Sequence, residues 1–398
     1  MATNLLLISG YFKGERFMQQ AHARGAHCYL LTQERLLAEP WPREALQDVF
    51  ATPNDSPLAH IQNAVSYLAR TIPFDRIVAL DDFDVENAAS LREHLRIPGM
   101  GETTARYFRD KLAMRVKAEA EGIPCPPFVQ VLNDDKLRDF MARVPPPWMF
   151  KPRSEASATG IIKIESEEQL WRVVQDKGDR QSFYLLEKYL PGDVFHVDSL
   201  VWDQRVLFSG AHRCGRPPFN VAHGGGIFTT RTVERGSADE TALLALNERV
   251  LTRLGLVRGT SHTEFIKHAV DGKFYLLETS ARVGGAHIAE LVEASSGINL
   301  WAEWANVEMD ALEGKSYALP PLRQEYAGVL MTLARQQHPD LSGYADPEVV
   351  FRAREEHHAG LVVRSPSSAR VQSLLGSYTE RFMTDFYASL PASDKPSH

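Results

Sequence analysis

The sequence predicts an α/β protein of several domains, with a parallel sheet at the N-terminus and a mixed, strand-rich α+β part after it. The first hundred residues alternate short apolar runs with helical stretches, the pattern of a parallel sheet with helices on its faces. Beyond residue 148, strand-like runs follow one another with few helices between them. The chain has 398 residues, enough for two or three domains.

The elements of the first domain follow in chain order. We expect strands at 4–8, 26–31 and 77–80, and helices at 14–24 and 85–95. The glycine turn after the first strand lacks the GxGxxG spacing, so we interpret it as structural rather than dinucleotide-binding. Asp81 and Asp82 directly follow a strand, where they either meet a ligand or cap the next helix.

The second part begins after Ile97-Pro98-Gly99. A charged helix that contains Lys111 is expected from Thr103 to Glu121, where Gly122-Ile123-Pro124 ends it. Later strands are expected near 148–152, 182–190, 194–202, 205–211, 326–333 and 360–364, and later helices near 239–254 and 369–387. The tail from 389 to 398 is polar and is expected to be disordered. We place domain boundaries near residues 100 and 320, with subdomains 124–186 and 187–320 and a C-terminal α+β subdomain from 321.

Composition narrows the function classes. Apolar residues make up 44% and charged residues 24% of the chain, as in ordinary globular proteins. The net charge of −7 argues against a general binder of nucleic acid or anionic membranes. Three scattered cysteines without a CxxC pair indicate a reducing compartment and no structural zinc. Together with the absence of a leader-like apolar run, this predicts a cytoplasmic protein.

Two acidic residues stand out in the stretch from Arg258 to His287, which we interpret as two strands joined at Asp271-Gly272. Glu264 and Glu278 lie inside half-buried strand patterns, where a carboxylate is costly unless something compensates it. A divalent cation held partly by nucleotide phosphates would do so. Arg282, four residues later, offers a planar fork for a phosphoryl or carboxylate group. The alternative is two solvated glutamates on an ordinary hairpin.

The hairpin register decides between these interpretations. A strict two-residue turn places Glu264 opposite Thr279, so that Glu278 lies on the other face of the sheet. A three-residue loop with a bulge shifts the register by one and makes Glu264 and Glu278 diagonal neighbours on one face. We therefore predict a bulge.

Three other stretches are candidate ligand-binding segments, although none of them indicates a function when taken alone. A short strand ends at Lys151, and the small residues from Ser154 to Gly160 follow it, without the spacing of a P-loop. The strand 182–190 leads into a turn with an apolar wall, which suits an adenine slot or a plain strand end. The loop from His212 to Gly226 is basic and glycine-rich, as expected of a mobile anion-binding flap. Its histidines have no carboxylate or cysteine motif close by in the sequence, so a metal site is not indicated. No residue is marked as a base that would activate Cys214 as a nucleophile.

Taken in order, these motifs resemble those of the ATP-grasp superfamily of ligases over residues 1–390. The segments Asp110-Lys111…Gly122-Ile123-Pro124 and Phe150-Lys151-Pro152 resemble the family's two phosphate-lysine motifs, and the loop containing Ser157 and Gly160 resembles the one that covers the triphosphate. The stretch from Glu187 to Asp193 resembles the family's hinge. The resemblance implies that Glu187 and the backbone near Leu190 contact the adenine, Asp193 the ribose, Glu264 and Glu278 magnesium, and Arg282 the reacting phosphoryl group.

One position departs from the family pattern, because Ser280 stands where an asparagine ligand is common. The motifs around His262-Thr263-Glu264 and Ala281-Arg282 are similar to those of the L-amino-acid ligase branch, which joins amino acids into dipeptides. The resemblance implies ATP and Mg²⁺ as cofactors, with Mn²⁺ as an alternative metal, and catalytic roles for Arg282, Glu264 and Glu278. Further substrate-binding candidates are Arg213, Arg216, His223, Gly225, Gly285 and His287.

The resulting hypothesis is an ATP-dependent ligase that activates a carboxylate as an acyl phosphate and couples it to an amine. Its expected partners are small carboxylates and amines, with amino acids favoured, and neither nucleic acid nor a membrane; a homodimer stays open. The alternatives are a carboxylase of the biotin or purine type and an ATP-binding regulator that does not turn over ATP.

Overall fold

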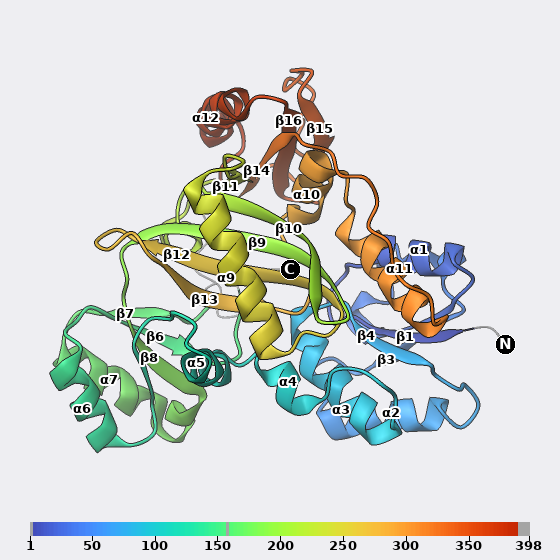
Figure 1. Ribbon diagram of the computed structural model, residues 1–398, viewed down its shortest axis with the longest axis horizontal. Helices are drawn as coiled ribbons and strands as arrows, with labels where there is room; N and C mark the ends of the chain where they lie inside the picture. The colour runs from blue at the N-terminus through green and yellow to red at the C-terminus, as the bar shows by residue number, and fades with distance from the viewer. Residues whose placement is uncertain (1–2, 157–158, 389–398) are drawn as a thin grey trace.

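The computed structural model describes residues 3–156 and 159–388, except for the side chains at 220, 222 and 223. Figure 1 shows three lobes around a central sheet. The predicted disorder of the tail lies outside the described residues.

The N-terminal lobe contains the parallel sheet that the sequence predicts. Its strands are β1 (Asn4–Ile8), β2 (His27–Gln33), β3 (Asp48–Thr52) and β4 (Arg76–Ala79), in the order β3-β2-β1-β4 and parallel throughout. The connecting helices are α1 (Glu15–Ala23), α2 (Leu58–Leu68) and α3 (Val85–Leu95), with short 3₁₀ helices η1 (Glu34–Leu36), η2 (Arg43–Ala45) and η3 (Asp82–Asp84). Leu5 and Leu7 pack on one side of the sheet and Leu6 and Ile8 on the other. Both faces are covered, which explains why β1 is a continuous apolar run.

The single helix expected from Thr103 to Glu121 is wrong. The chain forms α4 (Glu102–Arg106) and α5 (Lys111–Ala120), separated by a turn. The Asp110 carboxylate caps α5 by accepting hydrogen bonds from the backbone N–H groups of Leu112 (2.9 Å) and Ala113 (3.3 Å). This break places Lys111 at the first turn of α5 rather than in the middle of a helix.

The second lobe is built on a four-stranded antiparallel sheet. Its strands are β5 (Phe128–Gln130), β6 (Trp148–Pro152), β7 (Ile162–Ile164) and β8 (Tyr184–Lys188), in the order β5-β8-β6-β7. The helices α6 (Asp134–Arg143) and α7 (Glu167–Lys177), followed by η4 (Gly178–Phe183), lie beside it. Trp148, Phe150 and Leu186 belong to its buried core. This lobe carries Lys151 and Glu187 on adjacent strands.

The central sheet has eight strands in the order β13-β12-β9-β10-β11-β14-β16-β15. They are β9 (Gly192–Trp202), β10 (Arg205–Cys214), β11 (Phe228–Thr232), β12 (Gly259–His268), β13 (Phe274–Ser280), β14 (Tyr326–Leu333), β15 (Val349–Arg352) and β16 (His358–Ser365). The strands beyond residue 320 therefore continue the central sheet. The remaining helices are α8 (Pro218–Gly224), α9 (Ala238–Leu254), α10 (Ile288–Ser296), α11 (Leu300–Leu312) and α12 (Ser368–Asp385). Figure 1 shows α9 crossing one face of this sheet.

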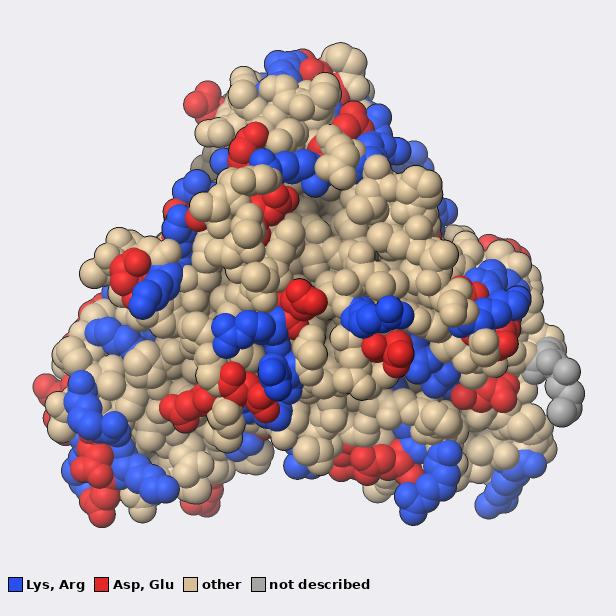
Figure 2. All heavy atoms as spheres, in the orientation of Figure 1, with Lys and Arg blue, Asp and Glu red and all other residues tan. Residues whose placement is uncertain are grey.

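Figure 2 shows acidic and basic side chains interspersed over the face in view. No helix among the described residues is long and apolar enough to cross a membrane. Cys28, Cys125 and Cys214 are free thiols. Burial raises the pKa of the Cys214 thiol, so this group is not activated as a nucleophile.

Candidate active site

The two predicted carboxylates lie directly opposite each other on β12 and β13. Glu264 pairs with Glu278 across the strands, and the register shifts between Glu264 and Phe265, which pairs with Leu276. The predicted bulge is therefore confirmed, although it lies at Leu277 inside the hairpin rather than at the turn. The pair is direct rather than diagonal. The predicted three-residue loop is wrong, because the chain reverses over the four residues 269–272, where the His268 N–H donates to the Lys273 carbonyl (2.9 Å).

A fully buried arginine holds the bulge. A bulged residue leaves its backbone groups out of the strand ladder, so a buried carbonyl there needs another donor. The Arg115 guanidinium on α5 donates from Nη2 to the Leu277 carbonyl oxygen (2.6 Å). It also donates from Nε and Nη2 to Oε2 of Glu187 (3.1 and 3.0 Å). Arg115 thus links the bulge to Glu187 of the second lobe, and because Glu278 follows the bulge, this link helps to orient the Glu278 side chain.

Glu187 also pairs with Lys151, whose ammonium group contacts the other carboxylate oxygen. Burial raises the pKa of Glu187, but Lys151 and Arg115 outweigh burial and hold it below the ordinary value. Glu187 is therefore ionised inside the protein. The structure brings together two residues that the resemblance assigns to nucleotide binding, and adds Arg115 as their unexpected partner.

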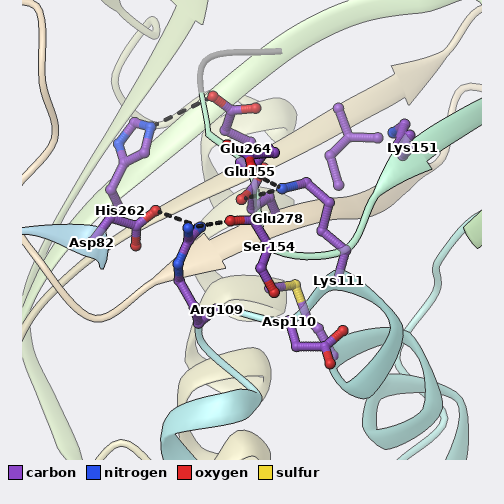
Figure 3. Close-up of polar contacts among 12 residues, drawn as sticks. Asp82, Arg109, Asp110, Lys111, Lys151, Ser154, Glu155, His262, Glu264 and Glu278 are labelled. Carbon is purple, nitrogen blue, oxygen red and sulfur yellow. Dashed lines mark hydrogen bonds and ion pairs between the residues drawn. The ribbon is translucent and has the colours of Figure 1, made fainter. Parts of the chain in front are cut away.

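Lys111 reaches the carboxylate pair from the first turn of α5. Its ammonium group lies 2.8 Å from Oε1 of Glu278 and 2.5 Å from the backbone oxygen of Glu155 (Figure 3). A buried lysine next to one of two adjacent glutamates offsets part of their repulsion. Lys111 thus contacts both the carboxylate pair and the loop that follows Lys151.

The small-residue loop after Lys151 is held at its start by two cations. The Ser154 backbone oxygen accepts a hydrogen bond from Arg109, and the Glu155 oxygen accepts one from Lys111. Gly160 has a φ of 67°, a conformation in which glycine is unstrained. Ser157 lies outside the described residues, so its role stays a prediction.

A group of histidines lies beside Glu264 on the same face of the sheet. Oxygens of the buried Asp198 carboxylate lie 2.7 Å from Nδ1 of His196 and 2.8 Å from Nδ1 of His262. The other ring nitrogen of His262 lies 3.6 Å from Oε1 of Glu264 (Figure 3). These residues are close enough together to be considered as metal ligands. The two distances from Asp198 to the histidines are those of direct hydrogen bonds, so the Asp198 carboxylate has partners within the protein.

Electrostatics in this group favour a charged His262 and an ionised Glu264. Burial lowers the pKa of His262, but Asp198 and the nearby Glu264 outweigh burial and raise it to about 9. Burial lowers the pKa of His196 to about 4 despite the same aspartate. Burial raises the pKa of Glu264, but the His262 imidazolium outweighs burial and keeps it below the ordinary value.

Arg282 faces an aspartate of the N-terminal lobe. Its Nε lies 4.0 Å from Oδ1 of Asp82, and Oδ2 of that carboxylate lies 3.4 Å from Nη1 of Arg109. Burial raises the pKa of Asp82, but Arg282 and Arg109 outweigh burial and lower it. Arg282 Nε and Asp82 Oδ1 are both buried without a hydrogen-bond partner in the described part of the chain. Ser280 lies on the same face, opposite His262.

The sequence left two roles open for Asp81 and Asp82, contact with a ligand or capping of the next helix, and the structure shows the capping role for Asp81. Asp81 caps η3 by accepting a hydrogen bond from the Phe83 N–H (2.9 Å). Asp82 faces the site, as residues at the carboxyl ends of parallel strands do.

The predicted flap, residues 212–226, contains the short helix α8. Arg213 forms an ion pair with Asp193 (2.8 Å) and lies opposite Phe195, one position out of phase with His212. This register turns Arg213 away from the face of Glu264, so the structure does not bring it to the carboxylate pair. Arg216 donates to the Gly225 carbonyl (3.4 Å). The side chain of His223 lies outside the described residues.

Leu190 lies just beyond β8 and packs against an apolar cluster of Val194, Cys214 and Ile266, as Leu277 and Tyr275 also do. The adenine contact of its backbone stays a prediction.

His287 lies at the start of α10, between two glutamates. Its ring nitrogens are 3.5 Å from Glu290 and 3.4 Å from Glu355, a residue beyond β15. Burial lowers the pKa of His287, but the two carboxylates raise it to about 9. Gly284 is packed tightly, since a Cβ there would lie 3.0 Å from both Asp198 and His262, whereas Gly285 has open space around it. The C-terminal part thus contributes Glu355 beside a candidate residue.

Sequence reasoning missed several residues that shape this site. They share burial and charge, and they come from elements far apart in the chain: Arg109, Arg115, His196 and Asp198. The sequence could have indicated such residues only where a charged residue occupies an apolar position of a predicted helix or strand. Arg115 and Asp198 are both of this kind.

The order of sheets and the paired glutamates define the class: the chain has the ATP-grasp fold, as the sequence motifs predict. It superposes on an L-amino acid ligase from Bacillus licheniformis with a TM-score of 0.75, at 18% identity and with 97% of this chain and 99% of that chain covered. It also superposes on a biotin carboxylase domain from Hydrogenobacter thermophilus, in complex with MgADP and bicarbonate, with a TM-score of 0.69, at 16% identity and with 95% and 90% of the chains covered. Identities this low establish the fold alone.

Among curated proteins, an L-arginine-specific L-amino acid ligase from Bacillus subtilis is 27% identical over 244 residues. The match covers 60% of this chain and 58% of that relative, which is less than two thirds of its length. No family model matches the sequence. The predicted resemblance to the L-amino-acid ligases is confirmed by these similarities.

Proposed function

We propose that this protein is an ATP-dependent ligase that activates a carboxylate as an acyl phosphate and couples it to an amine. One observation carries the proposal: Glu264 and Glu278 lie side by side, with Lys111 on one of them. Arg282 follows on the same strand end and points toward the N-terminal lobe. Cations and a pair of carboxylates placed together are the parts that phosphoryl transfer requires.

The residues present fit a nucleotide with magnesium. Glu264 and Glu278 retain 32% and 23% exposure of their side chains, so their oxygens are accessible to an ion. Carboxylate oxygens suit Mg²⁺, and we propose that these two residues hold it. Ser280 is a weaker ligand, and its hydroxyl lies near Asp82 instead. Magnesium, when bound, neutralises phosphate charge and orients the phosphoryl group for transfer. Mn²⁺ stays an alternative metal.

Lys111 and Lys151 are proposed to bind the phosphates of ATP, and Glu187, Leu190 and Asp193 the adenosine. Lys151 and Glu187 neutralise each other in the structure, so ATP binding would replace part of that ion pair with a lysine–phosphate contact. The loop from Ser154 to Gly160 is held near its start by the hydrogen bond from Lys111 to the Glu155 backbone oxygen. We propose that this loop covers the triphosphate and excludes water.

The reaction follows from these positions. An oxygen of the substrate carboxylate attacks the γ-phosphorus, the bond to the bridging oxygen breaks, and ADP leaves with that electron pair. The amine nitrogen then attacks the acyl carbon, phosphate leaves with the electrons of the carbon–oxygen bond, and the nitrogen loses a proton. Arg282 would stabilise the negative charge that develops in both steps, because its Nε is buried without a hydrogen-bond partner in the described residues.

We propose amino acids as substrates, and the similarity to two L-amino acid ligases supports this class. His287, Gly285, Arg216, Gly225 and His223 stay candidates for substrate recognition, and Arg213 for a contact nearer the ribose. A cytoplasmic location stays a prediction from the cysteine pattern, and a homodimer stays open.

Phosphate release over pairs of carboxylic acids and amines, with products identified by mass, tests the proposal. Glu264→Gln and Arg282→Ala should abolish substrate-dependent phosphate release while the circular-dichroism spectrum stays that of the wild type. Glu165→Gln changes a glutamate that is 61% exposed in the second lobe and serves as the matched control. Full release in either site variant refutes the assignment.

The same screen separates the alternatives. ADP formation with bicarbonate and no amino acid would favour a carboxylase, with which the chain shares its fold. ATP binding without phosphate release over the whole panel would favour a regulator.

A further inference from the structure

A cavity of about 220 Å³ lies between the N-terminal lobe and the central part of the chain. β4 and α3 line it on one side, and α11 and residues 256–258 on the other. One water needs roughly 10–15 Å³ of such volume, so the cavity has room for a small ligand with several waters. Ala281, which lies between Ser280 and Arg282 at the end of β13, also lines the cavity. None of the candidate site residues that the structure describes is part of the lining.

The charged side chains that line this cavity are three arginines and one glutamate: Arg76, Arg92, Arg258 and Glu308. Arg76 and Arg92 are each 92% buried, and Glu308 is equally so. Two positive charges are thus left without a counter-charge in the lining. Burying a guanidinium away from water is costly unless hydrogen bonds and an opposite charge compensate it.

The protein supplies only part of that compensation. Arg92 donates to the backbone oxygens of Ile77 (2.7 Å) and Met100 (3.0 Å), which are neutral acceptors. Arg76 donates to the Pro98 oxygen (3.1 Å), and its Nε lies 3.1 Å from Oε2 of Glu308. That approach is poorly aligned, because both atoms remain buried without a hydrogen bond in the described structure.

Arg258 is the least constrained of the three arginines. Its guanidinium stacks over the Trp202 ring at 5.8 Å and forms no ion pair with any described residue. Burial lowers the pKa of Arg76, and lowers that of Arg92 to about 10. Both directions agree with the incomplete pairing of these guanidinium groups.

We propose that this cavity binds a small oxyanion, a phosphate or carboxylate group, between the N-terminal lobe and the central sheet. An oxyanion offers acceptor oxygens to the guanidinium groups that the protein leaves incompletely paired, and arginine forks match its geometry. Bound there, it would tie β4 and α3 to α11, and it would contact the chain next to Ala281. The site does not depend on the proposed ligase activity.

Equilibrium dialysis with radiolabelled sulfate tests the proposal on the full chain. Sulfate serves as an unreactive probe, and a saturating magnesium complex of a non-hydrolysable ATP analogue keeps it from the phosphate positions of the candidate active site. We expect one saturable sulfate site per chain. Unlabelled phosphate, or malonate as a small carboxylate, should displace the sulfate and show which oxyanion class binds more tightly.

Two variants of the cavity lining should change sulfate affinity in opposite directions. Arg258→Met should weaken sulfate binding by at least about tenfold, because one charge pair near a protein surface is worth more than the 1.4 kcal/mol that tenfold represents. Glu308→Gln should strengthen binding, because it removes the only negative charge in the lining. Arg172→Met is the control, since it removes the same charge from an exposed position on α7.

Either of two results would refute the proposed oxyanion site. The first is the absence of saturable sulfate binding in the wild type, and the second is equal sulfate affinity in the wild type and in both cavity variants. In either case the arginines serve only to hold the lobes together. A circular-dichroism spectrum for each variant verifies that it is folded. If Arg258→Met does not fold, the sulfate affinity of Glu308→Gln still tests the proposed site.

Discussion

Replacing Arg115 with methionine should disrupt both the stability and the nucleotide site of this protein. The side chain is fully buried, and methionine fills a similar volume without the charge. The change removes two hydrogen bonds to Glu187 and one to the Leu277 carbonyl. Glu187 keeps Lys151 as a partner, so its charge is not left uncompensated.

The expected loss of unfolding free energy is about 3–5 kcal/mol, because removing one member of a buried ion pair costs this much. The remaining Lys151 contact favours the lower end of the range. The freed Leu277 carbonyl adds to the cost, since a buried acceptor without a donor costs about 1–3 kcal/mol. The bulge would relax as well, and a shift of Glu278 by about 1 Å would lower kcat/KM for ATP about a hundredfold.

Urea unfolding followed by circular dichroism, together with ATP kinetics, measures both effects. Arg172→Met, on the exposed face of α7, is the control and should change stability by no more than about 0.5 kcal/mol. A double variant with Glu187→Gln should lose less than the sum of the two single changes, because the groups interact. An Arg115→Met protein within about 1 kcal/mol of the wild type, with unchanged ATP kinetics, would falsify the role assigned to this residue.

Two further outcomes follow from the contacts near α10. The His287 imidazole has its pKa raised from 6.5 to about 9, so its ion pairs stabilise the fold fully below pH 6.5 and this stability is lost as the pH rises through 9. Between these pH values the free energy of unfolding of the wild type, measured with urea, should fall more than that of His287→Gln. The expected difference is about 1–2 kcal/mol once solvent screening of the exposed partners is allowed for; parallel pH profiles would contradict this. Gly284→Ala should destabilise the protein by about 1–3 kcal/mol, because a Cβ there meets side-chain atoms at 2.9 to 3.0 Å. Gly285→Ala, with nothing within 4 Å, should leave thermal stability nearly unchanged, and equal losses in the two variants would refute the packing argument.

Much of the fold could be read from local pattern. The parallel sheet of the N-terminal lobe and the strand-rich remainder are as predicted, and the helix from Val85 to Leu95 has the expected bounds. The helix expected from Thr103 to Glu121 was wrong, because helical composition continues through a turn that the Asp110 cap defines. A cap is visible in a sequence only when the preceding residues break the pattern, and those before Asp110 do not.

The candidate site was predictable in part. The motifs located Lys111, Lys151, Glu187 and the two glutamates, and the need for both carboxylates to share a face predicted a bulge. Its position at Leu277 was not predictable, because the residue that holds it comes from α5. In the same way, the contact of His196 and His262 with the same Asp198 could not be predicted from the sequence, because it depends on strand register.

The sequence by itself determined which residues carry charge at apolar positions, and therefore where chemistry or a buried ion pair had to lie. Only the tertiary structure decided which of those charges meet: Arg115 with Glu187, Asp82 with Arg282, and three arginines around one cavity. The physical reason is that local propensity and periodicity act over a few residues, whereas pairing of buried charges depends on groups that are far apart in the chain and meet only once the lobes pack together.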